Sequence, residues 1–213
     1  MASGCGSDGP SVSEECGFAA RYLPYELGYS WTYNVTDLGS GVRTTKTQTL
    51  SSALVESPDL PGEMFIEQTT VKATGTTVSL LRVDGDVLNR YRQEDFDDLG
   101  VSERVTIYEP AKVRLDETAD RLETGAAYTE AYTATITDST GSVPTSISED
   151  WEVINSAVEC TSPLGTFECL QIRRTRTLGG LATKDFYFAE GVGKVREEGA
   201  TQLEEVASCA APE

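Results

Sequence analysis

The residues of this chain that could do chemistry are mainly its carboxylates. The 213 residues include 35 acidic and 17 basic side chains and no histidine. Histidine is the usual general base and the commonest zinc ligand, so the serines and threonines have no evident partner for activation. The Gly-x-Ser-x-Gly pattern of a nucleophile elbow does not occur either. The sequence therefore predicts no catalytic residue, no cofactor and no enzymatic activity.

The densest acidic cluster consists of Glu94, Asp95, Asp97 and Asp98, and Asp84 and Asp86 precede it. Two carboxylates can hydrolyse a glycoside, and several carboxylate oxygens can bind Ca²⁺. The spacing fails the EF-hand pattern, because Leu88 stands where a ligand is needed. Solvated loop acids are the main interpretation and calcium binding is the alternative, so no metal site is predicted.

An aromatic stripe gives the clearest candidate for a ligand site. Tyr29, Trp31 and Tyr33 alternate with small or polar residues, which predicts a strand with one buried face. Such a stripe either fills a core or forms the wall of a cavity for an apolar ligand, such as a lipid or acyl chain. We therefore take these three residues as candidate ligand-binding residues.

The basic residues show one cluster, Arg173-Arg174-Thr175-Arg176. This run either meets an anionic ligand or partner, or it alternates along the wet face of a strand. The lysines are scattered along the sequence, at Lys46, Lys72, Lys112, Lys184 and Lys194. No glycine-rich phosphate-binding loop accompanies any of them.

The first residues resemble the end of a bacterial lipobox. Ala2-Ser3-Gly4 precedes Cys5, and a polar Gly-Ser-Asp-Gly-Pro stretch follows it. Cys5 is therefore the predicted lipidation site, although the charged and apolar parts of a signal peptide do not precede it. Residues 1–17 are predicted to be a flexible tether, 18–209 a single β domain and 210–213 a tail.

The other four cysteines form an even set, which in an exported protein predicts disulfides. Cys160 and Cys169 flank a hairpin, and a turn at Leu164-Gly165 would place them directly opposite each other. Cys16 and Cys209 would then join the two ends of the domain. A four-thiolate zinc site is disfavoured because no pair has the short C-x-x-C spacing.

The rest of the chain shows ten to twelve threonine-rich strands at hairpin spacing, with one short helix candidate at Asp116 to Thr124. We predict an all-β antiparallel meander that curls into a barrel or half-barrel, because closure removes exposed sheet edges. The net charge of −18 disfavours nucleic acid and anionic lipid headgroups as partners. The only predicted membrane contact is the N-terminal lipid.

Three segments resemble the TapB-like group of uncharacterised bacterial envelope lipoproteins. They are residues 22–33 (YLPYELGYSWTY), 161–170 (TSPLGTFECL) and 186–195 (FYFAEGVGKV). The departures are Leu23 for the group's usual Phe and Phe188 before the small residue. The resemblance implies a curved β-barrel or half-barrel, similar in outline to the LolA and LolB lipoprotein carriers, and an exported protein of the cell envelope or outer membrane. It implies no catalytic residues.

Two functions follow from these observations. The first is a non-enzymatic binding domain that holds an apolar ligand in a curled sheet. The second is a structural or protein-interaction module of the envelope with a filled core. An open cavity lined by tyrosine and tryptophan favours the first function, and a packed interior favours the second.

Overall fold

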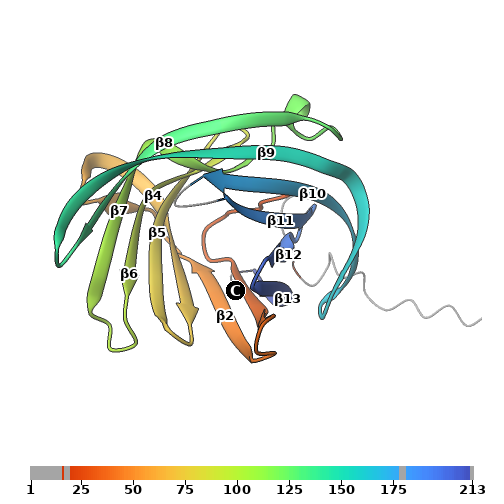
Figure 1. Ribbon diagram of the computed structural model, residues 1–213, viewed down its shortest axis with the longest axis horizontal. Helices are drawn as coiled ribbons and strands as arrows, with labels where there is room; N and C mark the ends of the chain where they lie inside the picture. Colours follow the sequence, from red (N-terminus) through yellow and green to blue (C-terminus); the bar gives the residue numbers. More distant parts are fainter. Residues whose placement is uncertain (1–15, 17–19, 178–180, 212–213) are drawn as a thin grey trace, which may run out of the picture.

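The computed structural model describes residues 16, 20–177 and 181–211, and these residues are nearly all β structure. The hairpin spacing yields thirteen antiparallel strands (Figure 1). They are β1 (Ser30–Asp37), β2 (Arg43–Leu50), β3 (Val55–Ser57), β4 (Leu60–Lys72), β5 (Gly75–Asp84), β6 (Val87–Phe96), β7 (Ser102–Asp116), β8 (Ala127–Asp138), β9 (Gly141–Ser162), β10 (Gly165–Thr177), β11 (Leu181–Ala189), β12 (Gly193–Gly199) and β13 (Gln202–Ala210).

The sheet closes on itself. Neighbours in sequence pair with each other from β4 to β13, β1 lies between β13 and β2, and β2 pairs with β4. Twelve strands therefore form a closed barrel, and β3 is one extra strand beside β4. The prediction of an all-β antiparallel meander curled into a barrel is confirmed.

Strand β1 shows why the pattern folds this way. Trp31 and Tyr33 point inward and are each 2% exposed, while Thr32 and Asn34, which alternate with them, are only partly buried. Period-2 alternation places one set of side chains in the core and the other at the solvent face. The aromatic rings pack beside Val206 and Leu50 from the neighbouring strands.

The barrel has two distinct ends. The turns between β1 and β2, β4 and β5, and β6 and β7 lie together along the lower edge of Figure 1. The β12–β13 turn lies at the same end, because Leu38 donates its backbone N–H to the carbonyl of Thr201. We call this the turn end.

Residues 20–29 cross the opposite end of the barrel. The backbone N–H groups of Tyr22 and Leu23 donate to the carboxylate of Glu117 after β7, and the carbonyl of Arg21 accepts from Gly191 after β11. Tyr25 stacks on Trp31 with ring centroids 5.5 Å apart. Because these contacts reach several sides of the barrel, the segment covers this end, which we call the closed end.

The two disulfides join Cys16 to Cys209 and Cys160 to Cys169, the pairs expected from the sequence. The expected register of the second hairpin was wrong, however. Ser162 pairs with Gly165, so the turn consists of Pro163-Leu164, and Cys160 lies opposite Phe167. The disulfide therefore joins diagonal neighbours on one face, with Cα atoms 6.0 Å apart.

Several sequence predictions fall at the edges of the described chain. Cys5 and all of the predicted tether except Cys16 lie outside the described residues.

The helix candidate at Asp116 to Thr124 contains a single 3-10 turn, Ala119–Arg121. No helix among the described residues has the length and apolar character needed to cross a membrane.

Candidate functional site

The interior of the barrel contains a cavity of about 440 Å³ that reaches the turn end. Exposed residues of the β4–β5 turn, Lys72 to Thr74, contribute to its rim. A smaller void with Leu23 and Tyr25 in its wall lies toward the closed end and shares Arg114 and Arg174 with the main cavity. The crossing segment therefore forms the floor beneath the cavity.

The charge of the cavity is opposite to that of the chain. The whole sequence has twice as many acidic as basic residues. Among the described residues, the cavity wall instead contains two carboxylates, Glu197 and Glu204, against seven cations. The cations are Lys46, Lys72, Arg90, Arg114, Arg174, Lys184 and Lys194. We call this space the cationic cavity.

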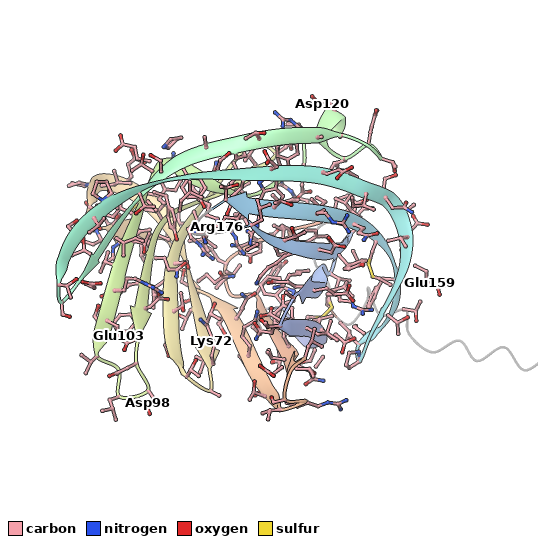
Figure 2. The ribbon with its side chains drawn as sticks, viewed as in Figure 1. Lys72, Asp98, Glu103, Asp120, Glu159 and Arg176 are labelled. Atoms are coloured by element: carbon pink, nitrogen blue, oxygen red, sulfur yellow. A yellow bond between two sulfur atoms is a disulfide. The ribbon has the colours of Figure 1, made fainter. Side chains whose placement is uncertain are left out.

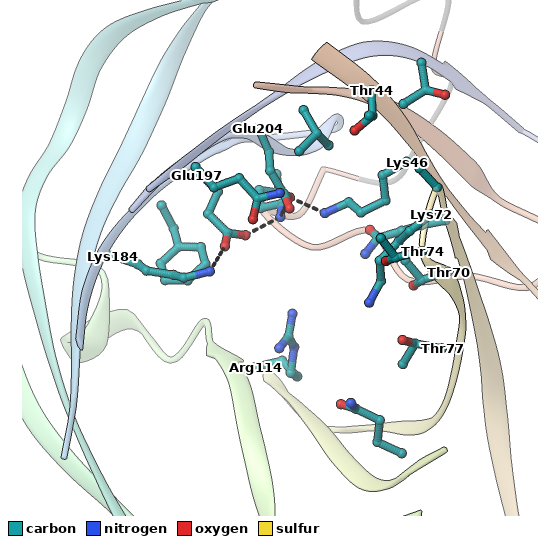
Figure 3. Close-up of a pocket in the computed structure, with 18 of the residues that line it drawn as sticks. Thr44, Lys46, Thr70, Lys72, Thr74, Thr77, Arg114, Lys184, Glu197 and Glu204 are labelled. Carbon is teal, nitrogen blue, oxygen red and sulfur yellow. Dashed lines mark hydrogen bonds and ion pairs between the residues drawn. The ribbon is translucent and has the colours of Figure 1, made fainter. Parts of the chain in front are cut away.

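One side of the cationic cavity is an alternating row of charges (Figure 3). Lys46 binds Glu204, Glu204 lies 2.8 Å from Lys194, Lys194 binds Glu197, and Glu197 lies 2.6 Å from Lys184. We call these five residues the lysine–glutamate chain. Its three ammonium groups share two carboxylates, so most of its charge is neutralised internally.

A β-bulge makes this row possible. Phe188 pairs with Lys194 and Tyr187 pairs with Arg196, so Val195 is an extra residue in β12. Strict alternation would place Lys194 and Glu197, three positions apart, on opposite faces of the strand. The bulge turns both toward the interior, where they are 8% and 9% exposed.

Three arginines form a second group, which we call the arginine group: Arg90 on β6, Arg114 on β7 and Arg174 on β10. Among the described residues, no carboxylate oxygen lies within 4.0 Å of the guanidinium of Arg90 or Arg114. Arg90 donates instead to the neutral amide oxygen of Gln93 at 2.6 Å. Figure 3 shows Arg114 pointing into the cavity.

The arginines affect one another electrostatically. Burial, followed by the charge of Arg114, lowers the pKa of Arg90 to about 10. Burial also lowers the pKa of Arg174, with Arg114 adding to this effect and Glu149 opposing it. Arg90 stays charged at neutral pH, because its lowered pKa still lies well above 7.

Arg174 is the member of this group nearest to a carboxylate. Glu149 is fully buried, and its Oε1 lies 4.0 Å from Arg174 and 3.9 Å from Arg176. Closer partners already occupy this oxygen, since Lys112 lies 2.7 Å away and the Tyr132 hydroxyl 3.0 Å away. Glu149 therefore offsets only part of the charge of Arg174.

Two interior lysines have lowered pKa values. Burial, followed by the charge of Lys194, lowers the pKa of Lys46 to about 7, although Glu204 acts in the opposite direction. Burial, followed by the charge of Arg174, lowers the pKa of Lys112 to about 6. For Lys194 burial acts to lower the pKa, but Glu197 and Glu204 outweigh it and raise the pKa. The positive charge of the interior thus depends on pH near neutrality.

The aromatic candidates lie behind the cationic cavity and do not line it. Tyr29, Trp31 and Tyr33 belong to the packed core, and Trp31 donates its indole N–H to the carbonyl of Val192 at 2.7 Å. The ring of Tyr33 underlies the ammonium groups of Lys46 and Lys194, at 4.8 and 5.0 Å from its centroid. Tyr33 therefore supports the lysine–glutamate chain from the barrel wall.

Acidic residues of the cluster around Glu94 are paired with nearby arginines, Asp95 with one on the neighbouring strand β7, Glu94 and Asp84 with one on their own strand. Asp95 lies 2.8 Å from Arg104, and Glu94 lies 2.9 Å from Arg92. Asp84 accepts a hydrogen bond from Arg82 at 2.8 Å. Among the described residues, no group of three or more acidic or cysteine side chains has the geometry of a metal site. These contacts favour the interpretation of the cluster as surface acids.

The basic run on β10 does not lie on one face. Arg173 points outward and binds Asp185 at 2.8 Å, while Arg174 and Arg176 lie within 4.0 Å of the buried Glu149. Figure 2 shows Arg176 inside the barrel. The interpretation as a wet strand face therefore holds for Arg173 alone. Leu170 and Ile172 belong to the core and share the period-2 face of Arg174, and this signal marks Arg174 as inward-facing.

The lysines that are scattered in sequence gather inside the barrel. Lys46, Lys72, Lys184 and Lys194 line the cationic cavity, and Lys112 is buried beside Glu149. Sequence analysis did not identify these residues as a site. The available signal was that each stands within a strand, but for Lys194 the face that it occupies depends on the bulge at Val195, which the sequence does not reveal.

Comparison with known proteins identifies the fold and no family. No protein-family model matches the chain, and no curated protein matches it. The resemblance of three segments to the TapB-like group therefore stays a prediction.

Two solved structures share the fold over nearly the whole chain. One is the "putative exported protein with YmcC-like fold" from Bacteroides fragilis, with a TM-score of 0.57, 12% identity and coverage of 90% of this chain and 99% of that one. The other is the "putative lipoprotein" from Parabacteroides distasonis, with a TM-score of 0.56, 11% identity and the same coverage.

Proposed function

We propose that this protein is an exported, non-enzymatic domain of the cell envelope that binds a small anionic ligand inside its barrel. The observation that carries the proposal is the reversed charge of the cationic cavity, with seven cations and two carboxylates in a chain of net charge −18. Buried charges without partners are costly. A bound anion would offset that cost, and a volume of about 440 Å³ suits a small molecule.

Export and lipid anchoring are supported by three features. The two proteins of similar fold are described as exported and as a lipoprotein. Disulfides are typical of exported proteins, and the chain has two. Cys5 has the sequence context of a lipidation site, so we propose that a lipid there attaches the domain to a membrane.

The path of the chain gives this anchored domain an orientation. Cys16 is joined to Cys209 by a disulfide, and Cys209 pairs with Trp31 near the start of β1. The start of β1 lies at the closed end of the barrel. A lipid on Cys5 would therefore attach the domain from the closed end. The cavity would open at the turn end, away from the anchoring membrane and toward soluble ligands.

The cationic cavity argues against one of the two functions predicted from the sequence and leaves the other as a second candidate. An acyl chain is a poor match for the cationic cavity, because charged side chains, threonines and glutamines make up most of its wall. A purely structural or protein-interaction module is the second candidate. It is favoured by the packed aromatic core behind the cavity, and it does not require the interior cations.

Thermal melting in a panel of small solutes tests the proposal. Anions such as malonate, citrate and phosphate should raise the melting temperature at millimolar concentration, because they bind only the folded barrel. Glycerol and spermidine, which are neutral and cationic, should not. The rise should shrink in Arg114→Gln and persist in Arg173→Gln, which removes the outward-facing arginine of the same run. Equal effects of anions and spermidine would contradict the proposal.

A further inference from the structure

The cations of the cavity differ in how much of their charge is available to a ligand. The lysine–glutamate chain has two carboxylates for three ammonium groups. The arginine group has no carboxylate within 4.0 Å of Arg90 or Arg114 among the residues that the structure describes, and only the shared Glu149 at 4.0 Å from Arg174. The available positive charge is therefore concentrated at the three guanidinium groups.

Two members of the arginine group, Arg174 and Arg90, are held in place by neighbouring side chains. The guanidinium of Arg174 lies 4.9 Å from the ring centre of Phe186 and 5.5 Å from that of Trp151. Arg90 is fixed by its hydrogen bond to Gln93, while its Nε is buried without a hydrogen-bond partner among the described residues. A guanidinium presents a planar fork of donors that matches carboxylate or phosphate oxygens. Fixed, unneutralised forks are typical of an oxyanion site.

Most of the remaining wall is polar without charge, and Val35, Ala73 and Phe186 are its apolar residues. Its uncharged polar residues are Thr44, Thr45, Thr70, Thr74, Thr77, Gln48, Gln93 and Gln202. Hydroxyl and amide groups can donate and accept hydrogen bonds, so they suit a ligand body that carries hydroxyls. Figure 3 shows Thr70, Thr74 and Thr77 together on one side of the cavity that Arg114 also faces.

We infer that the ligand is a small phosphorylated polyol, with its compact phosphoryl group on Arg90, Arg114 and Arg174 and its hydroxyl-bearing body against the threonines. The inference rests on the proposed function. A phosphoryl group places three oxygens and nearly two charges on one centre. That arrangement fits three guanidinium groups from three strands better than two separate carboxylates do, because each carboxylate carries a single charge.

Isothermal titration calorimetry at pH 7.5 in phosphate-free buffer tests this inference with two probes of nearly equal charge. Glycerol 3-phosphate has one phosphoryl group and two hydroxyls, whereas malonate has two carboxylates. Glycerol 3-phosphate should bind at least about tenfold more tightly. Arg114→Gln should weaken its binding by roughly 10- to 100-fold, the range for the loss of a charge-assisted hydrogen bond. Arg173→Gln, on the outer face, should leave binding unchanged.

The possible results separate the inference from the proposed function. Equal affinity for malonate and glycerol 3-phosphate overturns the inference and leaves anion binding in place. Absence of binding by both probes overturns both. Unchanged binding in Arg114→Gln and in a second variant, Arg90→Gln, also overturns the inference. Melting curves without ligand verify folding, and Arg114→Gln should melt no lower than wild type because it removes an unpaired charge.

Discussion

The ammonium nitrogen of Lys112 lies 2.7 Å from Oε1 of Glu149, and both side chains are almost fully enclosed by the barrel. Burial would raise the pKa of Glu149, but the charges of Arg174 and Lys112 outweigh it and lower the pKa. Glu149 is therefore an anion surrounded by cations. It holds the inner edge of the arginine group in place, and the stability of the barrel should depend on it.

Replacing Glu149 by glutamine should destabilise the protein by about 3–5 kcal/mol, because Arg174 and Arg176 lose the carboxylate that they share inside the barrel. Denaturant unfolding at pH 7 measures this loss. Asp150→Asn is the matched control, since Asp150 is the next residue, is exposed and bonds to Thr129 at the surface. Its effect should stay within about 0.5 kcal/mol. Similar effects of the two changes would contradict the account of Glu149.

The lowered pKa of Lys46 predicts a pH dependence of stability. Its pKa is about 7 in the folded protein against an ordinary value of 10.5. Between these values the unfolded chain holds a proton that the folded chain lacks, so stability should rise with pH from about 7 to 10 and fall as pH drops through this range. The slope from one such group is at most about 1.4 kcal/mol per pH unit.

Lys46→Met should reduce this slope. Lys112 should still contribute a slope of the same sign, because its pKa is lowered to about 6. Arg43→Met on the same strand is the control, since Arg43 is exposed and lies outside the lysine–glutamate chain. Urea unfolding at intervals from pH 6.5 to 9.5 supplies the measurement. An unaltered slope in Lys46→Met would show that Lys46 does not titrate there.

The two disulfides should differ in their effect on stability. Cys16 and Cys209 are 193 residues apart in sequence and Cys160 and Cys169 are 9 apart. In the loop-closure model, the long bridge stabilises by about 5 kcal/mol and the short one by about 2–3. Paired cysteine-to-serine variants, unfolded in denaturant, compare the two bridges. A larger loss for the Cys160/Cys169 variant than for the Cys16/Cys209 variant would contradict this order.

Tryptophan fluorescence distinguishes the aromatic core from the ligand site. Trp151 lies beneath Arg174, whereas Trp31 is hydrogen-bonded within the core. An anion in the cationic cavity should therefore change the emission of Trp151. Trp151→Phe should lose this signal, and Trp31→Phe should keep it. The opposite result would support the ligand wall of Tyr29, Trp31 and Tyr33.

The parts of this fold that depend on local pattern were predictable. Alternation in β1 identifies Trp31 and Tyr33 as inward-facing, and the cysteine spacing predicts the disulfide pairs. The turn at Pro163-Leu164 was not predicted, because a shift of one residue changes the register without changing the residue pattern.

The cationic cavity could not be predicted in the same way. Its cations come from strands that are far apart in sequence, such as Lys46 on β2 and Arg174 on β10, and only barrel closure brings them together. The bulge at Val195 also sets which face Lys194 occupies. An isolated lysine in a strand is usually solvated, so none of these lysines was expected inside the barrel. The composition indicated an acidic protein and gave no sign of a basic interior.

Native mass spectrometry of the protein purified from its own host at low ionic strength tests the central claim most directly. Low salt preserves electrostatic binding inside the barrel. We expect a bound species of small-molecule mass that is detected as an anion after release, and that is lost in Arg114→Gln and retained in Arg173→Gln. A wild-type protein that carries no adduct, or one that carries an uncharged acyl chain unaffected by Arg114→Gln, would contradict the claim that this barrel binds an anion.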